Sequence, residues 1–270
     1  MTTETLSTLA DTDEHDIEYP PAELDLSHIV TEDDTPVDNI ASAKQQRLLV
    51  EPLYSAHPLG ERIFFADSNV GIFPLLHGAP LVPDTFLSLD VQPQQDWWEK
   101  KNRAYFLWEF GKAPEVVIEI VSNRRGGEIV RKVDAYARMR ISYYVVLDPS
   151  HQLSSTTLRT FRLEGSSYRE SALPFFPEIG LGLALWRGHY EDIEQEWLRW
   201  CTPDGALVPT GAELAADYAR VAAEQGRIAA AQMQLATAQT QLAAAHLQRA
   251  ESAEARLAAL EAELSRLRGA

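Results

Sequence analysis

Residues 114–149 constrain the fold of this chain more than any other stretch. They predict a buried strand at 115–122, a glycine-containing loop, an amphipathic helix at 128–140 and a second apolar strand that ends before Pro149. Two buried strands joined by a helix are typical of α/β folds, in which such strands share one sheet. We therefore expect an α/β protein.

The first of these strands carries one acidic residue within an apolar run. Side chains alternate between the two faces of a strand, so Glu119 points to the same side as Val117 and Val121. An ionised carboxylate among such neighbours is costly unless it is paired with a base or bound to a metal ion. The strand itself leaves both interpretations open, a buried ion pair and a metal ligand.

The helix that follows carries a base beside its apolar face. Lys132 lies next to this face, one turn before Tyr136. A carboxylate at the end of the strand and a lysine on the next helix can form a hydrolytic pair, because strand ends in α/β sheets commonly bind ligands. The alternative is an ion pair of Lys132 with Glu128 on a solvated helix surface. The apolar positions are Ile129, Val133, Tyr136 and Ala137.

A second acid opens another strand earlier in the chain. Asp84 follows Pro83 and precedes an apolar run at 85–91. Two carboxylates that converge on one point suit a hard divalent cation, which prefers oxygen ligands. An acid that forms a turn after proline is the competing interpretation of Asp84.

Taken together and in order, these motifs resemble the Uma2 family of restriction endonucleases, within the PD-(D/E)xK nuclease superfamily. The resemblance extends over about residues 40–205 and includes the tryptophan-rich stretches at 96–112 and 196–205. The superfamily's usual Glu-x-Lys is absent, because Ser122 and not lysine lies near Glu119, and Lys132 fits the position of a lysine moved to the helix. The motifs are Pro83-Asp84, residues 117–122, Lys132 with Tyr136, and residues 143–149.

The resemblance implies a restriction-endonuclease-like core, with a mixed central sheet flanked by helices. It also implies an endonuclease that hydrolyses phosphodiester bonds of nucleic acid, above all DNA, with Mg²⁺ or Mn²⁺ as cofactor. Asp84, Glu119 and the backbone carbonyl of Ile120 would hold the metal. Lys132 would orient the attacking water or stabilise the transition state.

The charge distribution bears on a nucleic-acid partner. The formal net charge is −16, but 12 of the 40 acids lie in residues 1–38, which contain no lysine or arginine. The remaining 232 residues carry 28 acids and 24 bases, without a basic patch that would indicate a DNA surface by charge alone. Arg124 and Arg125, on the loop before the helix, are the expected nucleic-acid contacts.

The composition divides the chain into three parts. Residues 1–38 are acidic and polar and are expected to be a disordered tail; residues 39–210 are expected to form the nuclease-like domain. Residues 211–270 predict a long helix or coiled coil through which the protein forms a homo-oligomer, the alternative being a helix folded back on the domain. Its apolar seam is Ile228, Leu235, Leu242, Leu257, Leu260, Leu264 and Leu267.

This helix supports an alternative function. A catalytically inactive nuclease-fold binding module that oligomerises through residues 211–270 would explain the missing strand lysine and the acidic balance. A single cysteine, Cys201, and the lack of any apolar run of about 18 residues predict a cytoplasmic protein without a membrane segment. None of the histidines has a metal-binding spacing.

Three further elements are expected around the central stretch. Residues 39–54 predict a helix that ends near Pro52, because proline interrupts helical hydrogen bonding. Residues 105–110 predict a strand, and the runs at 158–163 and 168–171 predict a hairpin.

Overall fold

The computed structural model describes residues 39–75, 80–92, 96, 103–122 and 127–268. The acidic segment 1–38, predicted to be disordered, lies outside the described residues, as do Arg124 and Arg125. From Ile40 onward the contacts join the chain into one unit.

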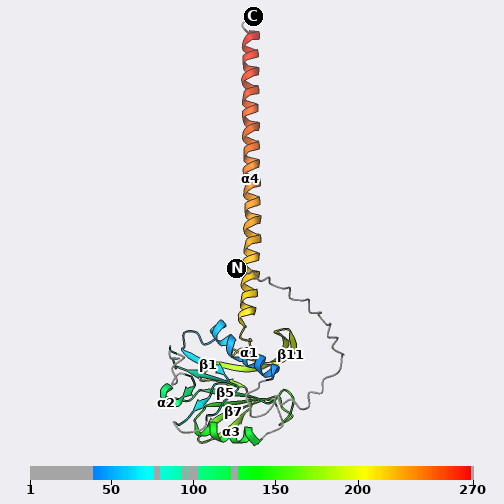
Figure 1. The fold of residues 1–270 in the computed structure, drawn as a ribbon. Helices are drawn as coiled ribbons and strands as arrows, with labels where there is room; N and C mark the ends of the chain where they lie inside the picture. The colour runs from blue at the N-terminus through cyan, green and yellow to red at the C-terminus, as the bar shows by residue number, and fades with distance from the viewer. Residues whose placement is uncertain (1–38, 76–79, 93–95, 97–102, 123–126, 269–270) are drawn as a thin grey trace, which may run out of the picture. The chain divides into compact units, whose positions relative to one another are not determined.

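A six-stranded mixed sheet forms the centre of the fold, in the order β1-β3-β5-β6-β7-β8 (Figure 1). Only β5 and β6 are parallel within it, and helix α3, Gly127–Arg138, connects them. The strand–helix–strand unit predicted for residues 114–149 is therefore present, and the fold is mixed α/β as expected. The strands are β1 Phe64–Ser68, β3 Thr85–Leu89, β5 Val116–Ile120, β6 Tyr143–Leu147, β7 Leu158–Glu164 and β8 Ser167–Ser171.

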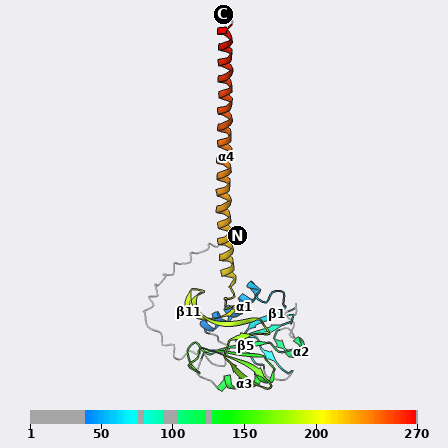
Figure 2. The same cartoon turned by 180° about the vertical axis from the view of Figure 1, so that it is seen from behind.

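The two faces of this sheet build two separate apolar cores. Val116 and Ile118 of β5 belong to the core that contains Leu49 of helix α1, Ile40–Ala56. Val117 belongs to the other core, with Tyr136 of α3. Helices α1 and α3 accordingly lie on opposite sides of the sheet, and Figure 2 shows the same arrangement from behind. The alternation predicted for this strand determines which residues face α3.

Two smaller sheets complete the domain. The first, in the order β11-β10-β9, contributes Leu183 and Trp200 to the core on the α1 side, and the Trp200 indole donates to the Leu49 carbonyl at 2.7 Å. The second pairs β2 with β4 in parallel. The strands are β2 Ile72–Phe73, β4 Tyr105–Phe106, β9 Phe175–Phe176, β10 Leu181–Tyr190 and β11 Ile193–Cys201.

Two boundaries predicted from the sequence are wrong. Helix α1 continues through Pro52 to Ala56. Pro52 stands in its last turns and is buried, as are Leu49 and Leu53, so packing outweighs one lost helical hydrogen bond. The strand predicted at 105–110 is only the two residues of β4, and Leu107–Phe110 form the short helix α2. The hairpin of β7 and β8 is confirmed.

Helix α4, Gly211–Arg268, has no buried residue along its 58 residues. Thr210 and Glu213 cap its start reciprocally, because each backbone N–H donates to the other's side chain, at 2.8 Å and 3.2 Å. The Gly211 N–H donates to Glu51 of α1 at 2.9 Å, and Arg199 of β11 donates to Glu213 at 2.9 Å and 2.5 Å. Bonds from Thr210, Glu51 and Arg199 therefore fix the first turn of α4 to the domain. No helix among the described residues combines the length and apolarity needed to cross a membrane.

Candidate active site

Glu119 lies near the end of β5, on the face covered by α3. The residue as a whole is 6% exposed, and both carboxylate oxygens accept hydrogen bonds from α3. The Tyr136 hydroxyl donates to one oxygen at 2.6 Å, and the Lys132 ammonium donates to the other at 3.0 Å. Tyr136 thus packs in the core and also reaches the carboxylate, and Lys132 pairs with Glu119.

Burial and the neighbouring groups have opposite effects on the pKa of Glu119. Burial raises the pKa of Glu119 to about 7, and the nearby charge of Asp84 also raises it. Lys132 and the Tyr136 hydroxyl lower the same pKa but do not outweigh burial. A carboxyl group with a pKa near 7 is only partly ionised at neutral pH, so a further cation would favour its charged form.

Asp84 reaches the same region from the start of β3. One of its carboxylate oxygens accepts a hydrogen bond from the Ile120 backbone N–H at 2.6 Å, one residue beyond Glu119. Strands β3 and β5 pair with Thr85 opposite Ile118, which brings the Pro83-Asp84 motif beside the end of β5. The structure therefore brings together Asp84, Glu119 and Lys132.

Ile120 takes part through its backbone. Its N–H points to Asp84 rather than into the next strand. In a strand the N–H and C=O of one residue leave from the same edge, so we expect the Ile120 carbonyl on the Asp84 side as well. That is the position in which it could add an oxygen ligand to those of Asp84 and Glu119.

Two amides near the site were not predicted from the sequence. Gln46 of α1 is 3% exposed and donates to the second oxygen of Asp84 at 3.0 Å. The side-chain amide of Asn69, a residue with φ 56°, donates to the side-chain amide oxygen of Gln46 at 2.9 Å. Gln45 and Gln46 lie between Lys44 and Arg47, so their sequence context marks neither as buried; Gln45 instead bonds both backbone groups of Leu198.

Two other acids have structural roles. The Glu51 carboxylate accepts the hydrogen bond from the Gly211 N–H described above, so its role is to hold the start of α4. Asp148 is buried after β6 and accepts three backbone N–H groups, from Gln152, Leu153 and Ser154. These bonds make it a turn-forming residue. The two expected phosphate contacts, Arg124 and Arg125, cannot be placed because they lie outside the described residues.

The donor set suits a small, hard cation. The described residues contain no group of three or more His, Cys, Asp or Glu side chains that could hold a metal ion. Mg²⁺ commonly uses only one or two carboxylates and keeps several water ligands. The oxygens of Asp84 and Glu119, with the Ile120 carbonyl, fit that requirement.

The fold and the site define a class of protein. A mixed sheet that brings two carboxylates and a lysine together at the end of its parallel pair is the arrangement expected for a nuclease fold. The Uma2 family, described as "Putative restriction endonuclease", matches residues 28–185 of this chain. The match spans more than half of the chain, and the protein belongs to the Uma2 family. No curated protein matches the chain.

Proposed function

We propose that this protein is a metal-dependent endonuclease that hydrolyses phosphodiester bonds, with DNA as the first substrate to test. The observation that carries the proposal is the convergence on Glu119 of one acid and one base from separate elements, Asp84 and Lys132. The description of the family as restriction endonucleases favours DNA.

Mg²⁺ or Mn²⁺ would be held by Asp84, Glu119 and the Ile120 carbonyl. When bound, such an ion lowers the pKa of a water ligand and neutralises charge on the scissile phosphate. The Ile120 N–H and Gln46 orient the Asp84 carboxylate, and each occupies one oxygen of it. Tyr136 holds one oxygen of Glu119 in the same way.

Lys132 would act on the phosphate. Its side chain is 18% exposed, compared with 8% for that of Glu119, so the ammonium lies between the buried acid and solvent. A positive charge fixed there would stabilise the negative charge that develops during hydrolysis. Arg124 and Arg125 would contact phosphates further along the strand and position it.

Cleavage of plasmid and linear DNA, with Mg²⁺ or Mn²⁺ supplied, tests the proposal. We expect Asp84→Asn, Glu119→Gln and Lys132→Met each to lower the rate by about 100-fold or more, as the loss of an electrostatic group in an active site typically does. Glu164→Gln is the matched control, because its exposed carboxylate pairs with Arg169 in the hairpin of β7 and β8. Full activity of Glu119→Gln would refute the proposed site.

A second candidate is a nuclease-fold module without catalysis, which acts through α4. The observation in its favour is the apolar seam of this helix, in which Leu235, Leu257 and Leu267 are 62%, 59% and 73% exposed. We propose that the seam pairs with α4 of a second copy, because a long helix rarely keeps such a seam in water. Wild-type protein that forms oligomers but cleaves neither DNA nor RNA with either metal would favour this candidate.

A further inference from the structure

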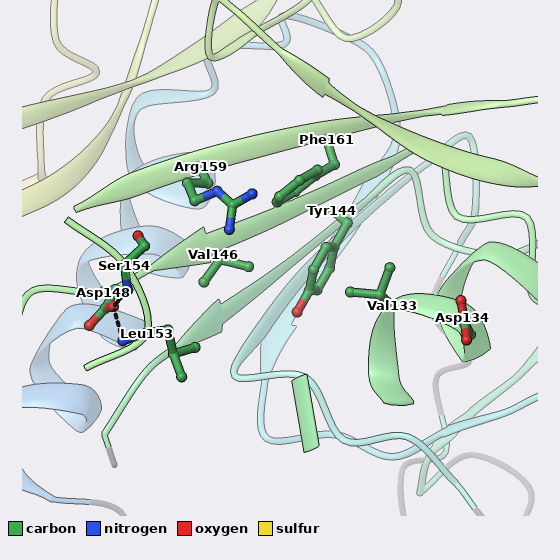
Figure 3. A pocket seen from close by; sticks show the side chains of 9 residues that line it. All are labelled: Val133, Asp134, Tyr144, Val146, Asp148, Leu153, Ser154, Arg159 and Phe161. Atoms are coloured by element: carbon green, nitrogen blue, oxygen red, sulfur yellow. Dashed lines mark hydrogen bonds between the residues drawn. The ribbon is translucent and has the colours of Figure 1, made fainter. Parts of the chain in front are cut away.

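A pocket of about 280 Å³ opens between α3, β6, β7 and the loop after β6 (Figure 3). Its walls are mainly apolar and aromatic. The volume lies just below the range of about 300–1,000 Å³ that is usual for drug-sized ligands, so the pocket suits one small ring system. The walls used in the argument are Val133, Tyr144, Val146, Leu153, Arg159 and Phe161.

The pocket adjoins the candidate active site along the sheet. Glu119 of β5 pairs in register with Val146 of β6, and Val146 pairs with Arg159 of β7. Residues paired across strands point to the same face, so these three side chains form one row. Two strand spacings separate the ends of the row, which places the backbone of Arg159 about 10 Å from that of Glu119.

Tyr144 gives the pocket an unused polar group. Its side chain is fully buried, and among the described residues its hydroxyl has no hydrogen-bond partner. Figure 3 shows the hydroxyl end of the ring directed between Val133 and Val146. By contrast, the hydroxyl of Tyr168, whose ring packs on Tyr144, donates to the Ile141 carbonyl at 2.7 Å. Buried hydroxyls normally have partners, so a ligand is the natural partner for Tyr144.

The charges around the pocket favour a neutral ligand. The Arg159 guanidinium lies 4.9 Å from the centre of the Phe161 ring and is held by Glu170 through two hydrogen bonds, at 2.9 Å and 2.8 Å. Asp134 and Asp148 also line the pocket. Among the described lining residues the base is already paired and two acids lie nearby, which disfavours phosphate in the pocket. A flat ring with a polar edge matches its aromatic walls and its free hydroxyl.

We propose that this pocket binds one unstacked nucleobase of the substrate, next to the phosphodiester bond that is cut at Glu119 and Asp84. The proposal rests on the proposed nuclease function and names its substrate class, a single-stranded or locally unpaired nucleic acid. Enzymes that take a base out of a duplex hold it in a snug pocket by stacking and by hydrogen bonds to its edge. Here Phe161 supplies the aromatic wall. The Tyr144 ring already packs on other aromatic rings, and its contribution is the hydroxyl that forms the hydrogen bond.

Binding measured without metal tests the pocket apart from catalysis. The probes are short fluorescent oligonucleotides in EDTA: single-stranded DNA, single-stranded RNA and fully paired duplex DNA, each titrated with the full chain. Tyr144→Phe removes only the hydroxyl, and Leu153→Trp fills the pocket from a rim position that is 37% exposed. We expect Leu153→Trp to weaken single-strand binding about 10-fold, as the loss of one stacked base does, and Tyr144→Phe to weaken it by a smaller factor.

The controls are chosen to match each change. Tyr168→Phe removes a neighbouring hydroxyl that already has a partner, and Leu173→Trp adds an indole at a position 71% exposed, outside the pocket. Both should bind like wild type, and duplex affinity should change little in every variant. If Leu153→Trp loses more affinity for single-stranded DNA than for RNA, or the reverse, the nucleic acid with the larger loss is the one whose base binds in the pocket.

Unchanged single-strand affinity of Leu153→Trp overturns the pocket proposal. If the wild type nevertheless cleaves DNA with Mg²⁺ and Glu119→Gln does not, the nuclease function stands and only the pocket assignment fails. If the pocket variants lose single-strand affinity while no variant or wild type cleaves, the pocket stands and the nuclease function fails.

Discussion

In the absence of divalent cations, Glu119→Gln should remove a pH-dependent loss of stability from this protein. Burial raises the pKa of Glu119 from 4.5 to about 7 in the folded chain. The unfolded chain therefore releases this proton at a lower pH, and the free energy of unfolding falls as the pH rises between those two values. The fall amounts to about 3 kcal/mol, since each pKa unit corresponds to about 1.4 kcal/mol.

The pKa of Glu119 already includes the effects of the groups that face its carboxyl group. Lys132 and Tyr136 of α3 favour the charged form, whereas Asp84 of β3 opposes it. Glutamine keeps the shape of the protonated side chain. The variant should therefore match the wild type near pH 4 and exceed its free energy of unfolding by about 3 kcal/mol at pH 8.

Urea unfolding in EDTA, followed by tryptophan fluorescence, measures this difference. Trp197 and Trp200 are buried in the domain, and α4 contains no tryptophan, so the signal reports the domain alone. Subtracting the two proteins at each pH removes the contribution of every group that titrates alike in both. A difference that stays constant from pH 5 to pH 8 would refute the reasoning, because the carboxyl group would then titrate alike in the folded and unfolded chains.

Three further predictions follow from the site and from α4. Saturating Mg²⁺ at pH 8 should raise the free energy of unfolding of the wild type by about 3 kcal/mol at a hundred times Kd, but not that of Glu119→Gln, as urea unfolding will show. Tyr136→Phe should slow DNA cleavage about 10-fold, because one oxygen of Glu119 loses its donor; Tyr168→Phe should not. Leu260→Ser with Leu264→Ser should lower the molar mass measured by sedimentation equilibrium, because both side chains are exposed on the apolar seam.

Each of these has a contrary result. Equal stabilisation of wild type and Glu119→Gln by Mg²⁺ would place the ion elsewhere. Equal cleavage rates for the two tyrosine variants would show that the Tyr136 hydroxyl does not position the carboxylate. An unchanged mass for the double serine variant, next to an Ala258→Ser control, would mean that the seam does not hold copies together.

The burial and position of the central residues of the candidate site were predictable because the pattern is local. One acid within an apolar strand predicts both that Glu119 is buried and to which face of the sheet it points. Helical spacing predicts that Lys132 lies beside the apolar face of the helix, which packs on the sheet. The order of motifs then predicted that Asp84 would meet Glu119, although 35 residues separate them in the sequence.

The rest depends on packing between distant segments. Gln46 reaches Asp84 across 38 residues, and nothing in its own neighbourhood distinguishes it from Gln45, which faces Leu198. The pocket at Tyr144 likewise requires β7 and the loop after β6 to come together, which no local pattern expresses. Pro52 shows the opposite case, in which a strong local rule is overridden because the side chain fills a core position.

The first turn of α4 has a consequence for where the folded domain ends. Arg199 is 3% exposed, and its carboxylate partner is Glu213, three residues beyond the expected domain end at 210. A fragment cut at 210 would leave this guanidinium buried without its counter-charge, and would also remove the cap that Thr210 shares with Glu213. A fragment intended to fold by itself must therefore extend through the first turn of the helix, even if the remainder of α4 is removed.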